Sequence, residues 1–332
     1  MQVFYPEYYH RFRCLAAACP DSCCKEWTVD VDVDSAEYYR TLPGPLGDRL
    51  RAVLSDTDSG TVMTIENGRC PMWRQDGLCR IQAELGHDAL CKTCREFPRL
   101  CHDYGDFMEL GLELSCPEAA RLILGSEQAQ MQIAERQGGA VPEYDTELME
   151  ILKESRTQVL EFLDSAQYSV PETLAIILLY SHNVQAQLDG GEGDIFDPQC
   201  CLTEARKYAK AGDMPALFSF FGGLEILTEE WSERLKCLPK PIQWTQPLRA
   251  LARYMIGRYW LQAVSDYDLV CRVKLTVVAC LLVGALGGDI IQTAQLFSKE
   301  IENDPDNMEA ILDGAYTDPA FTDVNLLSLL LT

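Results

Sequence analysis

The sequence predicts a mainly α protein in which a small cysteine-rich α+β part, residues 1–125, precedes an all-helical part, residues 126–332. Ten of the fifteen cysteines fall in the first 116 residues, among short segments that alternate apolar and polar side chains. From residue 115 onward the apolar residues recur at helical spacing instead. An apolar fraction of 47% supports a well-formed core and argues against disorder.

Three segments of the first part are expected to be short strands. Residues 27–34 alternate strictly, and residues 107–114 alternate with Met108, Leu110, Leu112 and Leu114 on one face. Residues 61–65 are rich in β-formers just before the turn signal Asn67-Gly68. The three aspartates at 30, 32 and 34 are expected on a solvated strand face, since the Gly and Glu of a calcium loop are missing. Three short strands give a small sheet with too little core to fold alone, so a bound metal that stabilises this part is expected on physical grounds.

The second part is expected to begin at a helix cap. Ser115 and Glu118 have the spacing of a capping box, and Pro117 suits a first helical turn. Helices are then expected after Pro142, from Pro171, and near residues 247–264, 269–286 and 290–301. The stretch Leu275–Leu286 is about one core helix long, and no stretch reaches 18 uncharged apolar residues, so no membrane span is predicted.

The cysteines of the first part have ligand-like spacings: Cys14-x4-Cys19-x3-Cys23-Cys24, Cys70-x8-Cys79, Cys91-x2-Cys94, Cys101 and Cys116. No secretory leader is visible at the start of the sequence, so a reducing cytoplasm is expected, where such clusters hold zinc or iron more often than they form disulfides. Only the pair at 91 and 94 has the usual zinc spacing, whereas iron–sulfur clusters accept looser ones. Eight or more thiols exceed one zinc site, and could fill one four-iron cluster with spares or two sites.

Charge narrows the set of partners. With 28 Lys and Arg against 51 Asp and Glu, the net charge is −23. Such a surface repels phosphate backbones, and no local basic patch is visible, so nucleic-acid binding is not expected. The same charge would attract a lysine-bearing protein, although it also serves solubility alone.

Taken together, the ordered motifs of residues 12–121 resemble the flagellin lysine-N-methylases, a family with a cysteine-rich domain associated with zinc or iron chelation. The motifs are Phe12-Arg13-Cys14, Cys19-x3-Cys23-Cys24-x2-Trp27, Cys70-Pro71-Met72, Gly77-Leu78-Cys79, Cys94-x2-Phe97-Pro98-Arg99 and Leu114-Ser115-Cys116-Pro117-Glu118-Ala119-Ala120-Arg121. Beyond residue 121 the chain resembles the family only in being helical, and the aromatic run of residues 254–260 adds to that resemblance.

The resemblance implies a cytoplasmic protein-lysine N-methyltransferase that acts on flagellin lysine side chains, with S-adenosylmethionine as methyl donor and a four-iron cluster, or zinc, as metal centre. The metal ligands it implies are Cys14, Cys19, Cys23, Cys24, Cys70, Cys79, Cys94 and Cys116. Cys91 and Cys101 are then extras of this sequence, although Cys91 retains the zinc-like spacing. Arg99 and Arg121 are expected either to pair with carboxylates structurally or to hold the donor's carboxylate in a bidentate fork.

Other functions stay open at this stage. The chain could be a metal-binding or metal-delivery module without methyltransferase activity, which would release its metal to mild chelators. It could also be a redox protein, which would require a cluster that cycles reversibly. The sequence does not indicate a catalytic base or an oligomeric state.

Overall fold

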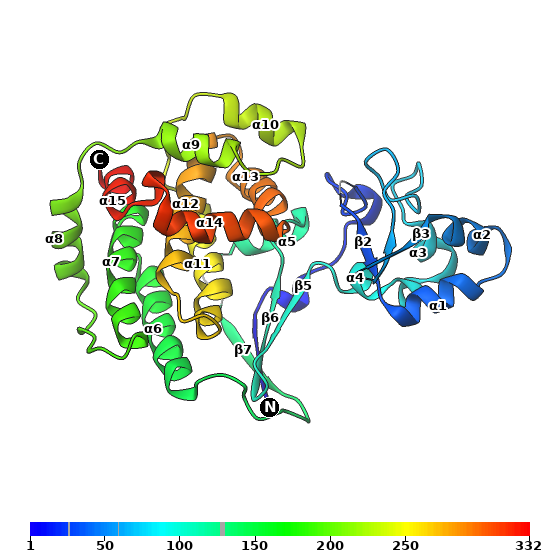
Figure 1. The fold of residues 1–332 in the computed structure, drawn as a ribbon, viewed down its shortest axis with the longest axis horizontal. Coiled ribbons are helices and arrows are strands. Elements are labelled where there is room, and N and C mark those ends of the chain that lie inside the picture. The colour runs from blue at the N-terminus through cyan, green and yellow to red at the C-terminus, as the bar shows by residue number, and fades with distance from the viewer. Residues whose placement is uncertain (26, 59, 127–129) are drawn as a thin grey trace. The chain divides into compact units, whose positions relative to one another are not determined.

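The computed structural model describes residues 1–25, 27–58, 60–126 and 130–332, which form two compact units (Figure 1). The cysteine-rich unit comprises Phe12–Leu100 and Cys116–Glu118; the helical unit comprises Met1–Arg11, Cys101–Ser115 and Ala119–Thr332. A mainly α chain with a small α+β part confirms the predicted fold class. The units interleave along the chain, and the division into domains at residue 125 stays a prediction.

The cysteine-rich unit consists of short elements. They are η2 (Ala16–Ala18), β2 (Val29–Val31), α1 (Val33–Thr41), α2 (Gly44–Val53), β3 (Leu54–Thr57), β4 (Gly60–Met63), α3 (Arg80–Leu85), η3 (His87–Ala89) and α4 (Lys92–Glu96). β5 (Arg99–Asp103) begins in this unit and ends in the helical one.

The helical unit begins with strands and continues with long helices. Its smaller elements are β1 (Gln2–Pro6), η1 (Tyr9–Arg11), β6 (Phe107–Leu112), α5 (Pro117–Leu124) and β7 (Met131–Glu135). Its later elements are α6 (Thr146–Ser165), α7 (Val170–Leu188), α8 (Pro198–Tyr208), α9 (Met214–Gly222), α10 (Glu229–Lys236), α11 (Gln246–Tyr259), η4 (Trp260–Val264), α12 (Val270–Leu286), α13 (Ile290–Phe297), the π-helical turn η5 (Ser298–Glu302), α14 (Pro305–Thr317), η6 (Pro319–Phe321) and α15 (Asp323–Leu331).

The strands form two sheets and not the single sheet that the sequence suggested. In the cysteine-rich unit the order is β2-β4-β3, with Val29 opposite Met63; in the helical unit it is β5-β6-β1-β7, with β1 parallel to β6 and antiparallel to β7. Residues 107–114 therefore do not pair with residues 27–34. Alternation reports only that a segment is half-buried, and carries no information about which segment pairs with it.

The predicted strand at residues 27–34 is correct only in its centre. β2 ends at Val31, and Asp32 caps α1 instead of continuing the strand, because its Oδ1 accepts the Ser35 N–H at 3.0 Å. An Asp with a free backbone amide three residues on is a helix start, and this local hydrogen bond outweighs the alternation. The Asn67-Gly68 turn is confirmed, with φ angles of 51° and 71° at its two central residues.

The core of the helical unit is α12, every residue of which is buried. α7, α11, α13 and α14 pack around it, so the apolar stretch of residues 275–286 is a core helix as predicted (Figure 1). Among the residues that the structure describes, no helix is long and apolar enough to cross a membrane.

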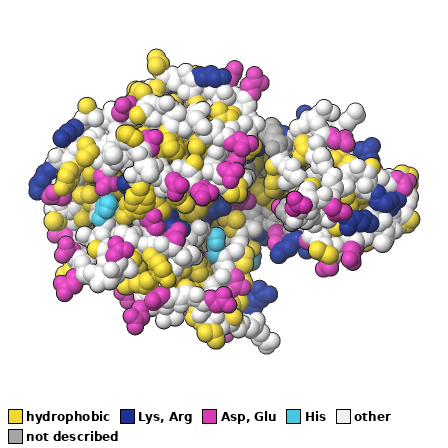
Figure 2. Space-filling view, viewed as in Figure 1, with side chains coloured by type: hydrophobic (Ala, Val, Ile, Leu, Met, Phe, Trp, Pro, Cys, Tyr) yellow, Lys and Arg dark blue, Asp and Glu magenta, His cyan; other side chains and the backbone are white. Residues whose placement is uncertain are grey.

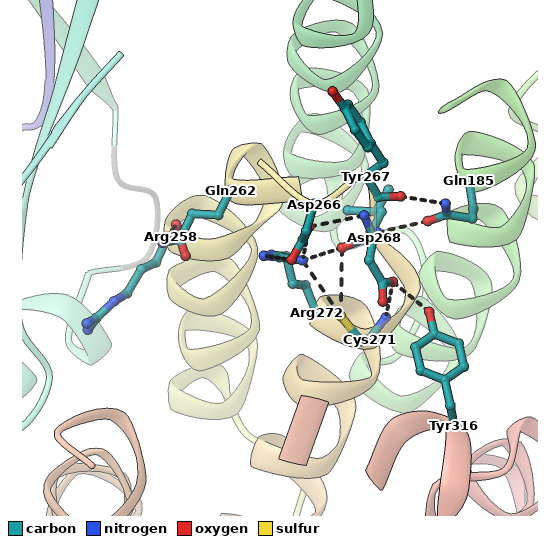
Figure 3. Close-up of polar contacts among 10 residues, drawn as sticks. Gln185, Arg258, Gln262, Asp266, Tyr267, Asp268, Cys271, Arg272 and Tyr316 are labelled. Carbon is teal, nitrogen blue, oxygen red and sulfur yellow. Dashed lines mark hydrogen bonds and ion pairs between the residues drawn. The ribbon is translucent and has the colours of Figure 1, made fainter. Parts of the chain in front are cut away.

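A tight turn fixes the start of α12. Gln185 on α7 donates to the Tyr267 carbonyl at 2.7 Å and accepts the Leu269 N–H at 2.8 Å (Figure 3). Arg272 donates to both carboxylate oxygens of Asp266, at 2.8 and 2.9 Å. Tyr267 takes a left-handed φ of 62°, and these bonds on both sides hold it there.

The capping box predicted at Ser115 is wrong. α5 starts at Pro117, and the Ser115 Oγ is buried without a hydrogen-bond partner among the described residues. The Ser115 carbonyl instead accepts Gln295 Nε2 at 2.7 Å. A tertiary contact from α13 thus holds this residue in place of the local cap.

Substitution of Gly47 tests how tightly the cysteine-rich unit packs. A Cβ at Gly47 in α2 would lie 1.8 Å from the Leu42 carbonyl oxygen, whereas a Cβ at Gly257 in α11 would meet nothing within 4 Å. Gly47→Ala should therefore destabilise the unit by roughly 1–3 kcal/mol or more. Gly257→Ala should stabilise its helix by up to about 1 kcal/mol. Thermal melts of both variants check this, and a neutral Gly47→Ala would show that α2 is loosely packed.

Candidate metal centre

Nine cysteines lie in the cysteine-rich unit, and all are free thiols. They include all eight of the predicted ligands, with Cys91 as the ninth. Cys101 belongs to the helical unit instead, as part of β5. The structure thus brings the predicted set into one unit, and adds to it a residue that the resemblance had set aside.

Four of these thiols lie in or against one small apolar core, and the exposed Cys94 lies beside one of them. We call the five the inner thiol group: Cys24, Cys70, Cys79, Cys91 and Cys94. Cys70 and Cys91 are buried within that core, and Cys24 and Cys79 pack against it. Cys94 joins through a hydrogen bond between its thiol and that of Cys91.

Backbone contacts hold the inner thiol group in place. The Cys70 N–H donates to the Cys24 carbonyl at 2.7 Å, and the Arg80 N–H donates to the Met72 carbonyl at 2.7 Å. The Lys92 N–H donates to the Asp32 carboxylate, also at 2.7 Å. Segments separated by up to 60 residues are thereby tied to one another beside the thiols.

Burial makes these thiols poor acids by themselves. Burial raises the pKa of Cys70 to about 12 and also raises the pKa of Cys79, and the neighbouring Cys24 and Cys91 add to both rises. Within the pair at 91 and 94, the shared hydrogen bond lowers the pKa of Cys91 and raises that of Cys94. A bound metal ion would reverse this balance, because a coordinating thiol is deprotonated outright.

The other four thiols form the outer thiol group: Cys14, Cys19, Cys23 and Cys116. The turn η2 folds the chain back between Cys14 and Cys19, with the Cys19 N–H donating to the Ala16 carbonyl at 3.1 Å. Burial raises the pKa of Cys19, and the neighbouring Cys14 contributes. A hydrogen bond with Cys24 and burial raise the pKa of Cys23, and Cys14 and Cys116 add to it.

The donor set fits a thiophilic metal in kind and number, since soft thiolates select zinc and iron–sulfur clusters. Yet no three Cys, His, Asp or Glu side chains in the described ranges converge on a point where a metal ion could bind. Binding would require the thiols to rotate toward a common centre. The metal and its nuclearity stay predictions.

The two arginines predicted to bind the donor do not lie in one unit. Arg99 belongs to the cysteine-rich unit, with its guanidinium 5.3 Å from the centroid of the Phe12 ring. Arg121 lies on α5 in the helical unit. The ring contact gives Arg99 a packing role, and the predicted donor contacts of both residues stay untested.

The helical unit contains a buried polar cluster that the sequence did not reveal. The carboxylate of Glu302, at the end of η5, is fully buried; it lies 3.0 Å from Arg258 and accepts the Tyr259 hydroxyl at 2.7 Å. The Tyr254 hydroxyl also donates to it, at 3.2 Å. The run of residues 254–260 had been noted as aromatic, but its acidic partner lies more than 40 residues further along the chain.

Two titratable side chains lie beside this cluster. Burial lowers the pKa of His102, and Arg258 adds to the effect; its Nε2 is buried without a partner among the described residues. Burial raises the pKa of Glu113, which Arg258 partly offsets. A neutral imidazole and a carboxyl that resists ionisation are groups that can accept or hold a proton near neutral pH.

Removing the cation of the buried pair should be costly. Arg258→Met leaves the Glu302 carboxylate buried and unpaired, which should destabilise the chain by roughly 3–5 kcal/mol. The matched control is Lys207→Met at the exposed pair with Glu204, where little change is expected because solvent screens the pair. Urea unfolding measures the free energy of unfolding of both variants. Equal decreases would show that the buried pair contributes no more to stability than the exposed one.

Glu113 should make stability depend on pH. Its folded pKa lies above its unfolded value of 4.5, so folding favours the neutral form, and the stability this gives is lost as pH rises through the folded pKa. Glu113→Gln should therefore raise the melting temperature most at neutral pH, with a gain that shrinks toward about pH 4. The exposed Glu143→Gln serves as control, and a gain that grows on acidification would reverse the assigned sign.

Comparisons with known proteins find relatives that match part of the chain. The chain is 32% identical over 138 residues to a lysine-N-methylase of Salmonella typhimurium, and 31% identical over 144 residues to one of Salmonella choleraesuis. Each match covers 40% of this chain and 34% of the relative, so the chain spans about a third of the length of these two relatives.

A third relative is covered more fully. The chain is 31% identical over 131 residues to the flagellar biosynthetic protein FliU of Salmonella muenchen, which covers 37% of this chain and 78% of FliU. No family model matches the sequence, and no solved structure matches it. The extent of the FliU match, with two lysine-N-methylases beside it, shows that the chain belongs to the flagellin lysine-N-methylase family.

Proposed function

We propose that the chain is a cytoplasmic protein-lysine N-methyltransferase that modifies flagellin lysine side chains with S-adenosylmethionine as donor, and that its cysteine-rich unit binds a thiolate-ligated metal or iron–sulfur centre. The observation that carries the proposal is the similarity to two lysine-N-methylases and to FliU. The clustering of nine free thiols in one small unit supports the metal centre.

The proposed reaction transfers a methyl group from a sulfonium to an amine. The lysine nitrogen attacks the donor's methyl carbon, the carbon–sulfur bond breaks, and S-adenosylhomocysteine leaves with the electron pair. The amine must be neutral to attack, so a base on the enzyme or in water takes its proton. An amine entering an acidic unit keeps its proton more strongly, and a buried group such as His102 would then be needed to accept it.

The distribution of charge supports a lysine-bearing partner for the helical unit. That unit carries 17 Lys and Arg against 36 Asp and Glu, whereas the cysteine-rich unit carries 11 against 15. On the face drawn in Figure 2, acidic side chains are spread over the helical unit. Association through such a field should weaken as salt rises, because exposed charges are screened within about 8–10 Å at physiological salt.

The metal's role in this proposal is structural. Metal binding contributes folding free energy directly in a domain that has little core of its own. The thiols of the inner and outer groups would hold it, and the proton transfer and substrate binding would fall to other residues.

Co-expression with the host's flagellin tests the proposed function. Intact-mass and peptide analysis should find lysine masses raised by one, two or three methyl groups, and the increments should vanish with Cys94→Ala. Cys237→Ala is the matched control, since that cysteine is exposed at the end of α10 in the helical unit. Unmodified flagellin beside metal-replete, donor-supplied protein would rule the enzyme out, and would leave the metal-binding module as the better account.

A further inference from the structure

The guanidinium of Arg258, in α11 of the helical unit, uses only one of its two edges. Its Nη1 lies 3.0 Å from the Glu302 carboxylate and donates to the Tyr254 hydroxyl at 2.5 Å. Its Nε is buried and has no hydrogen-bond partner among the described residues. Nε and Nη2 form the other edge, a pair of parallel donors whose geometry matches a carboxylate. Because an unpaired buried donor costs folding free energy, this edge is suited to a ligand.

Two other arginines of the helical unit bind a carboxylate of the chain with two bonds each. Arg156 donates to both carboxylate oxygens of Glu109, at 2.5 and 2.9 Å. Arg272 does the same to Asp266, at 2.8 and 2.9 Å. Figure 3 shows that Arg258 extends away from the polar contacts around Arg272. Arg258 therefore differs from both in contacting its carboxylate through a single nitrogen.

Two titratable side chains lie near the Arg258 guanidinium. The Leu114 N–H donates to the Tyr254 hydroxyl at 3.4 Å, so the segment that follows β6 lies against α11 and places Glu113 there. Glu113 is half-buried and has no hydrogen bond or ion pair in the part of the chain that the structure describes. His102, on β5, is the second, and its Nε2 is also buried without a partner among the described residues. Polar atoms from three elements are thus left unfilled in one cluster.

The charges of this cluster favour one kind of ligand. Arg258 and Glu302 offset each other, so a simple anion such as phosphate would face two carboxyl groups without a further cation. A zwitterion carries its own cation, which Glu113 can bind while Arg258 binds the negative group. An α-amino acid has its carboxylate and its ammonium group on one carbon, and so suits this pair of side chains.

We propose that Arg258 and Glu113 bind the α-amino-acid group of the sulfonium methyl donor, with Arg258 holding its carboxylate and Glu113 its ammonium group. The inference rests on the donor of the proposed function and deepens it, since the resemblance suggested Arg99 or Arg121 for the carboxylate. Both residues lie in the helical unit, as does His102. The donor would thus be held in the same unit as the group available to accept the lysine proton.

Calorimetric titration of the whole chain with S-adenosylhomocysteine tests the proposal, because this product keeps the donor's α-amino-acid group. The wild-type chain should bind it. Arg258→Lys keeps the positive charge but lacks the planar fork, and Glu113→Gln removes the carboxylate, so each should weaken binding at least about tenfold. The matched controls are Arg206→Lys and Glu143→Gln, two exposed residues, and both should bind as the wild type does.

A second ligand separates loss of this contact from general damage to the site. Methylthioadenosine lacks the α-amino-acid group, so Arg258→Lys and Glu113→Gln should bind it as the wild type does. Glu113→Gln is also expected to be more stable than the wild type at neutral pH, so unfolding would not explain its weaker binding of S-adenosylhomocysteine.

Four results would overturn the inference: no binding of S-adenosylhomocysteine by the wild type, equal binding by both variants, an equal loss of methylthioadenosine binding, or methionine bound as tightly as S-adenosylhomocysteine. Methylation of flagellin is measured separately. A chain that methylates flagellin while both variants bind S-adenosylhomocysteine normally refutes only this inference. A chain with the expected binding pattern that leaves flagellin unmodified refutes only the proposed function.

Discussion

The cysteine-rich unit depends on a core that is partly made of thiols. Cys70 and Cys91 are buried beside Val29, Leu50 and Met63, and Cys24 and Cys79 complete the same cluster. Elements of three to ten residues bury little apolar area, so such a core supplies only a modest part of the folding free energy. Ligation of these thiols would supply the rest, which links the fold of this unit directly to its proposed chemistry.

The helical unit has no such dependence. α12 is buried along its whole length, and long helices pack around it, so apolar burial alone can hold this unit together. The free energy gained from this apolar burial offsets the desolvation cost of the buried pair of Arg258 and Glu302 and of the tyrosines bonded to it. Apolar burial would thus stabilise the helical unit, and metal ligation the cysteine-rich unit. The buried polar cluster is the part of the helical unit that apolar packing does not explain.

Local sequence signals made many of the helices and turns predictable, whereas features that depend on long-range contacts were not. Helices such as α6, α7 and α12 follow from periodicity and proline positions, and the turn at Asn67 follows from its dipeptide. The end of β2 at Val31 and the missing cap at Ser115 do not, because Asp32 caps a helix and Gln295 binds the Ser115 carbonyl. In the same way, spacing identified the pair at 91 and 94, but only folding shows that Cys91 shares a core with Cys70.

Metal binding by the clustered thiols would tie the fold of the cysteine-rich unit to its proposed chemistry. X-ray absorption at the zinc and iron edges of the anaerobically purified protein tests it most directly, because the spectrum reports the ligand atoms around each metal. Sulfur should be the dominant ligand, with about four sulfurs per zinc near 2.3 Å. A protein without zinc or iron, or a metal surrounded by oxygen and nitrogen alone, would contradict it.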